Sequence, residues 1–129
     1  MRNLVIAILL LLALLPGGCG KASQPPPGQG SGGPLSEAEV MFNTKCARCH
    51  GLHGAADGPT TDSLQPRPRN YTDPAWQASV TDDQIKEIIV RGGMNMGKSP
   101  AMPGNPTLKN RPELLDGLVK LIRGFGKRP

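Results

Sequence analysis

The stretch KCARCHGLHG, residues 45–54, places two cysteines and two histidines within ten positions. Thiols and imidazoles at this density can hold a metal ion, form a redox-active disulfide or attach a haem. Cys46 and Cys49 are separated by two residues, and His50 follows directly. The three chemistries differ in what the rest of the chain must supply.

The first two chemistries lack partners in this sequence. A structural zinc site takes four Cys or His ligands, normally with a second pair from a distant segment, and the remaining cysteine is the isolated Cys19. A thioredoxin-like pair would follow a strand, whereas a helix signal precedes Cys46.

The pattern C-x-x-C-H is the attachment site of c-type haem, in which two thiols add to the vinyl groups and the histidine ligates iron. His53 lies on the same side of the iron as His50, and we interpret it as a solvated loop residue.

Two helix starts follow from capping signals. Ser36 is a good N-cap, and Glu39 three residues later completes a capping box for a helix that runs from about Glu37 into the cysteine motif. Thr81 and Gln84 repeat the device, and glycines follow this second helix at 92–93.

A third helix begins near Pro112, because proline is tolerated in a first turn. Its apolar residues recur at helical spacing: Leu114, Leu115, Leu118, Val119, Ile122 and Phe125. Residues 51–76 and 92–106 are rich in glycine and proline and predict long ordered loops. Long loops are uncommon in small domains unless they are functional, and wrapping a cofactor is such a function. Without a convincing strand pattern, the fold class is all-α.

These residues resemble the class I (monohaem) cytochrome c family, from about residue 35 to 126. The resemblance rests on CARCHG, on AADGP at 55–59, on IIVRGG at 88–93, on GKSPAMP at 97–103 and on Phe42 one turn before Cys46. It implies a small all-α fold of about three to five helices, with long loops wrapped around one covalently attached haem c and its iron. Phe42 is then expected to pack against Ile122 and Phe125.

The family also implies the other axial ligand. Three methionines share one loop, and the family ligand lies in a Met-Pro step, which here is Met102 with Pro103. Met96 is the alternative, followed by Met94. The family places a proline carbonyl against the free N–H of the histidine, and Pro59 matches that proline. Candidates for contacts with the haem propionates are Arg67, Arg69, Tyr71 and Trp76.

The resemblance implies a single-electron carrier with His/Met axial ligation and no catalytic residues. The alternatives are a haem subunit or domain of an oxidoreductase complex, or a haem-based ligand sensor. The net charge of +5 is a mild excess, and Lys45, Arg48 and Lys98 suit redox partners with an acidic docking face. Nucleic acid is not an expected partner, since the chain has no basic run with interleaved aromatics.

The N-terminal part carries an export signal. Residues 4–15 are an unbroken apolar run behind a basic start, which is too short for a membrane span and typical of a secretory signal. Cys19 after two glycines resembles a lipidated bacterial lipoprotein cysteine, although Pro16 stands where that family has leucine. We therefore divide the chain into a signal at 1–19, a flexible Gly/Pro/Ser linker at 20–34 and a cytochrome c domain at 35–129. The expected location is periplasmic, with a membrane anchor at Cys19; an uncleaved anchor helix or an ordinary signal are the alternatives.

Overall fold

The computed structural model describes residues 35–127, and every regular element in this range is helical. The predicted signal, the linker and Cys19 lie outside the described residues. Three segments form one continuous helical stretch: α1 at Glu37–Met41, a π-helical turn at Phe42–Cys46 and α2 at Ala47–His50. This stretch confirms the predicted helix that leads into the cysteine motif.

The start of α1 is the predicted capping box. The Ser36 hydroxyl accepts a hydrogen bond from the Glu39 N–H at 3.3 Å, and the Glu39 carboxylate accepts one from the Ser36 N–H at 2.8 Å. Further along, Thr44 donates its hydroxyl to the Val40 carbonyl at 2.8 Å. Such back-bonding competes with the regular helix ladder, and it accompanies the π-helical turn just before the cysteines.

Two further predicted helices are present. Helix α4 spans Asp82–Arg91 and starts with the Thr81/Gln84 capping box, and α5 spans Pro112–Phe125 with proline in its first turn. A short helix, α3 at Pro74–Ser79, was not predicted; its N-cap is Asp73, whose carboxylate accepts from the Ala75 N–H at 2.9 Å. Single 3₁₀ turns lie at Thr61–Ser63, Met94–Met96 and Pro106–Asn110.

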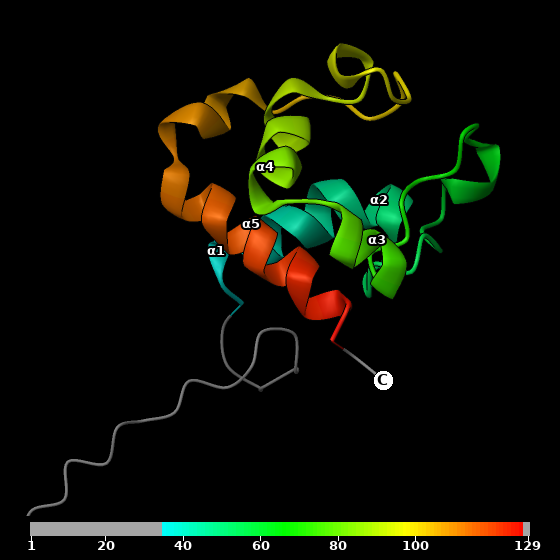
Figure 1. The fold of residues 1–129 in the computed structure, drawn as a ribbon, viewed down its shortest axis with the longest axis horizontal. Coiled ribbons are helices and arrows are strands. Elements are labelled where there is room, and N and C mark those ends of the chain that lie inside the picture. The colour runs from blue at the N-terminus through cyan, green and yellow to red at the C-terminus, as the bar shows by residue number, and fades with distance from the viewer. Residues whose placement is uncertain (1–34, 128–129) are drawn as a thin grey trace, which may run out of the picture.

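Helix α5 packs against both α1 and α4 and so joins the two ends of the described chain (Figure 1). Phe42 and Phe125 are each 1% exposed and lie with ring centroids 5.1 Å apart, as the family resemblance predicted. A Cβ on Gly117 would come within 3.0 Å of the Ala38 side chain, so α1 and α5 approach closely at this point.

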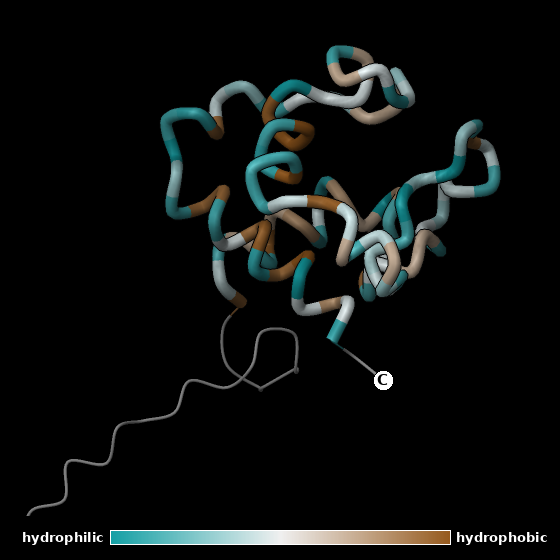
Figure 2. Tube along the Cα trace, viewed as in Figure 1, coloured by the Kyte–Doolittle hydropathy of each residue, from teal (hydrophilic) through white to brown (hydrophobic). Residues whose placement is uncertain are grey.

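Strongly apolar positions are concentrated along α4 and α5 (Figure 2). The loop after α2 and the loop after α4 are more polar, and both extend toward the right of the view in Figure 1. Within residues 35–127 no helix is both long enough and apolar enough to cross a bilayer. The packed helices form a scaffold, and the two loops predicted to wrap a cofactor project from it.

Candidate cofactor site

Helical geometry places the three residues of the C-x-x-C-H motif on one face. Cys46 is three residues before Cys49 and four before His50, which are the spacings of neighbours on a helix surface. Both cysteines are free thiols of intermediate exposure, and His50 is 8% exposed. Burial raises the pKa of the Cys46 thiol to about 11, against the opposing charge of Lys45. Cys46 is therefore a protonated thiol at neutral pH.

The loop after α2 folds back over the end of that helix. Gly51 ends α2 with φ of +79°, a conformation that favours glycine. Thr61 is 1% exposed and donates its hydroxyl to the Cys49 carbonyl at 2.6 Å, and Thr60 donates to the Arg48 carbonyl at 2.8 Å. The Thr60 hydroxyl also lies 3.2 Å from Cys49 Sγ. These bonds satisfy carbonyls that a helix end leaves open, so the loop fixes the position of the motif.

The contacts of His50 define its tautomer. Its Nδ1 lies 2.9 Å from the Arg69 carbonyl oxygen. A carbonyl only accepts hydrogen bonds, so Nδ1 carries the hydrogen, and Nε2 of the neutral ring keeps a lone pair. Burial lowers the pKa of His50 and so favours the neutral ring, although the hydrogen bond to the Arg69 carbonyl acts in the opposite direction.

An aromatic side chain fixes the plane of the imidazole. The ring of Tyr71 lies nearly parallel to that of His50, with centroids 4.4 Å apart and an interplanar angle of 11°. The Tyr71 hydroxyl donates to Nε2 at 3.2 Å. Tyr71 is itself buried at 6% exposure, and burial raises its pKa, so it stays a neutral donor.

The other residues predicted near the haem have the following contacts in the structure. The carbonyl at Nδ1 belongs to Arg69, where the family resemblance led us to expect Pro59; the long loop brings residue 69 to the ring instead. Arg67 forms an exposed ion pair with Asp62 at 3.0 Å. Trp76 packs on Tyr71 with ring centroids 5.2 Å apart. The side chain of Arg69 is exposed. Contacts of Arg69 and Trp76 with the haem propionates stay predictions.

The methionine loop closes on the end of α4. The Gly93 N–H donates to the Met102 carbonyl at 2.9 Å, and the Lys98 N–H donates to the Gly93 carbonyl at 2.8 Å. A Cβ on Gly92 would lie 2.5 Å from the Gly104 nitrogen, so the two limbs of the loop touch through their backbones. Met102 and the alternative ligand Met96 are both partly buried in this arrangement, whereas Met94 is 70% exposed.

The donor set fits haem c. Two free thiols stand beside a neutral imidazole whose Nδ1–H is already bound to a carbonyl, which is the usual way in which a protein orients a metal-ligating histidine. The Nε2 lone pair is the one that would bind iron. This lone pair lies in the plane of the imidazole, whereas Tyr71 stacks on a face of that ring, so the stacking can remain when iron is bound.

The comparisons agree with this chemistry. Residues 35–123 match the sequence profile of the family described as cytochrome c, which is more than half of the chain. The chain belongs to the cytochrome c family, whose members carry covalently bound haem c with iron and are typically electron carriers rather than enzymes. Comparison with curated proteins and with solved structures gave no significant match.

Proposed function

We propose that this protein carries single electrons on one haem held by Cys46 and Cys49, with His50 and Met102 as axial ligands. When bound, haem c supplies a reversible one-electron couple, and His/Met ligation raises its reduction potential. The observation that carries the proposal is the His50 ring, buried, neutral and held by the Arg69 carbonyl at Nδ1.

The chain's own residues contribute attachment, orientation and exclusion of water. Cys46 and Cys49 would each hold the haem by adding across one of its vinyl double bonds: a carbon–sulfur bond would form and the thiol hydrogen would go to the vinyl group, with no net oxidation. The Arg69 carbonyl accepts a hydrogen bond from Nδ1–H of His50, so the lone pair of the neutral ring is on Nε2. The buried ring of Tyr71 covers one face of the His50 imidazole and shields that face from water.

Met102 is proposed as the second ligand because its Met-Pro step matches the family and its backbone is held by Gly93. The test is the near-infrared and visible spectrum of the purified holoprotein with Met102→Ala and, as a control, Met96→Ala. Loss of the methionine–iron charge-transfer band in Met102→Ala alone supports the assignment. Retention of that band in Met102→Ala and its loss in Met96→Ala would transfer the role to Met96.

An electron carrier should leave no iron position open to small ligands. Carbon monoxide added to the reduced protein at neutral pH is expected to cause no rapid spectral change. Rapid binding would instead support a haem-based sensor.

A haem subunit of a larger oxidoreductase would co-purify with its complex from native membranes, whereas an independent carrier is recovered alone.

We further propose that the domain is exported and held at the membrane by a lipidated Cys19, with acidic redox proteins as partners. Lys45, Arg48 and Lys98 are exposed around the site loops and would attract such partners by charge. Exposed charge pairs are screened by salt, so electron exchange with an acidic partner should slow as ionic strength rises. A rate independent of salt would argue against an electrostatic docking face.

A further inference from the structure

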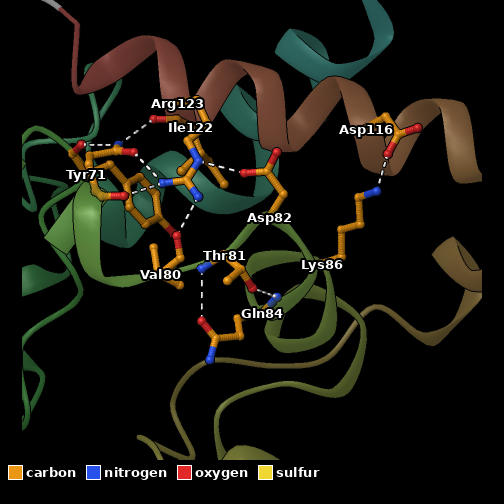
Figure 3. A network of polar contacts seen from close by, with 10 residues as sticks. Tyr71, Val80, Thr81, Asp82, Gln84, Lys86, Asp116, Ile122 and Arg123 are labelled. Atoms are coloured by element: carbon orange, nitrogen blue, oxygen red, sulfur yellow. Dashed lines mark hydrogen bonds and ion pairs between the residues drawn. The ribbon is translucent and has the colours of Figure 1, made fainter.

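Arg123 in α5 is the centre of a cluster of polar contacts (Figure 3). Its Nη1 donates to the Gln77 carbonyl at 2.7 Å and to Gln77 Oε1 at 2.9 Å, and its Nη2 donates to the Val80 carbonyl at 2.6 Å. Its Nε donates to the Asp82 carboxylate at 2.7 Å. The Arg123 side chain is 24% exposed, so this planar donor fork is held in one orientation and is largely shielded from water.

Gln77 extends the cluster toward the cofactor site. Because its Oε1 accepts from Arg123, its amide nitrogen faces the other way, and Nε2 donates to the Tyr71 carbonyl at 2.7 Å and the Ile122 carbonyl at 3.0 Å. The backbone N–H of Tyr71 donates a second hydrogen bond, to the Gly54 carbonyl at 2.7 Å. Both backbone polar groups of Tyr71 are therefore held.

The segment held in this way, residues 69–71, touches His50 at two points. The Arg69 carbonyl fixes the direction of Nδ1, and the Tyr71 ring fixes the plane of the imidazole. The two contacts restrict different rotations of one side chain. A shift of the segment would change both together.

We infer that Gln77 and Arg123 are positioning residues, which set the imidazole plane of His50 by fixing the segment 69–71. The inference rests on the proposed function, in which His50 ligates the iron. Groups that orient a ligating histidine tune the metal as well as hold it. The orientation of an axial imidazole plane also determines the g values of low-spin ferric haem and the chemical shifts of its methyl groups.

The test uses the full-length holoprotein with Gln77→Met, which keeps the length of the side chain but removes its polar atoms. We expect altered g values in the ferric electron paramagnetic resonance spectrum, a changed spread of haem methyl shifts by NMR and a shifted reduction potential. Arg123→Lys keeps the charge beside Asp82 but cannot donate to all four acceptors, and it should shift the same signals in the same direction.

Lys86→Met is the matched control. It breaks an equally short ion pair between α4 and α5, from Lys86 to Asp116 at 2.6 Å, and should leave these spectra as in the wild type. Wild-type spectra in both Gln77→Met and Arg123→Lys, with only a lower melting temperature, would overturn the inference. If Gln77→Met yields no holoprotein, Arg123→Lys decides alone. A wild-type protein without histidine-ligated low-spin haem would refute the proposed function itself.

Discussion

Gly54, in the loop after the cysteine motif, lies directly against the ring of Phe125 in α5. A Cβ on Gly54 would come within 2.7 Å of Phe125 Cδ2, and its φ is +73°. A side chain here would be both crowded and strained. The position thus joins the cofactor loop to the last helix through a contact that only glycine allows.

Gly54→Ala is expected to lower the free energy of unfolding by about 2–5 kcal/mol, since a left-handed conformation costs about 1–2 kcal/mol and overpacking about 1–3 kcal/mol. Gly97→Ala is the control, because Gly97 has a φ of +64° with open space around its Cβ; it should cost only about 1–2 kcal/mol. Denaturant unfolding of the holoprotein measures both values. Equal losses of unfolding free energy in the two variants would show that the Phe125 ring can move away from the added methyl group without a loss of stability.

The Ser36 cap predicts a pH-dependent contribution to stability. Hydrogen bonds from the Ser36 side chain, and then from its backbone, hold the pKa of Glu39 below its usual 4.5. A lowered carboxyl pKa stabilises the fold above the unfolded value and loses that effect as pH falls through the folded value. Ser36→Ala should cost about 1 kcal/mol at pH 7, with a smaller loss below pH 4.5.

Thr81→Ala is the matched control for this prediction, because the N3 partner of Thr81 is the uncharged Gln84. It should cost a similar amount, about 1 kcal/mol, with no change between pH 3 and pH 7. The readout is urea unfolding at several pH values. Parallel pH profiles for the two variants would contradict the role of the Glu39 charge.

Thr61→Val tests the buried bond to the end of α2. Valine has nearly the same shape as threonine but cannot donate to the Cys49 carbonyl, so we expect a loss of about 1–3 kcal/mol. Thr60→Val removes a hydroxyl bond to the Arg48 carbonyl, which keeps its bond from the Thr60 N–H at 3.1 Å. The Thr60 variant should therefore lose clearly less stability in the same unfolding assay.

Cys19→Ser tests the proposed anchor. If Cys19 is lipidated, the variant should move from the membrane fraction to the soluble fraction of the cell, with an unchanged haem spectrum. Mass spectrometry of the native N-terminus checks the modification directly. A wild-type protein that is already soluble after cell fractionation would rule out the lipid anchor.

The starts of α1, α4 and α5 were predictable because each signal is local. Ser36 with Glu39, Thr81 with Gln84 and Pro112 all act within one turn of helix. Helix α3 was missed because it is short and contains one large apolar side chain, Trp76, so no periodicity develops. Its only signal was an aspartate followed by proline, Asp73 with Pro74, which is a good N-cap and first position.

The surroundings of His50 could not be predicted in the same way. The Arg69 carbonyl reaches Nδ1 across 19 residues of irregular loop, and a backbone carbonyl has no signature in the sequence. The sequence indicated Tyr71 only as a candidate for contact with a propionate, and it did not indicate that the ring stacks on the histidine. Gln77 and Arg123 carried no motif, because their partners are mostly backbone carbonyls brought together by folding.

The packing of α1 against α5 also sets an order of assembly. The cysteine motif leaves the ribosome about 75 residues before Phe125, the ring against which Phe42 is buried. The contact between Phe42 and Phe125 thus forms only after a long stretch of chain has been made, and long-range contacts of this kind slow folding. Until α5 docks, Phe42 lacks the ring against which it is buried, and the helix that carries the two thiols has no partner at this position.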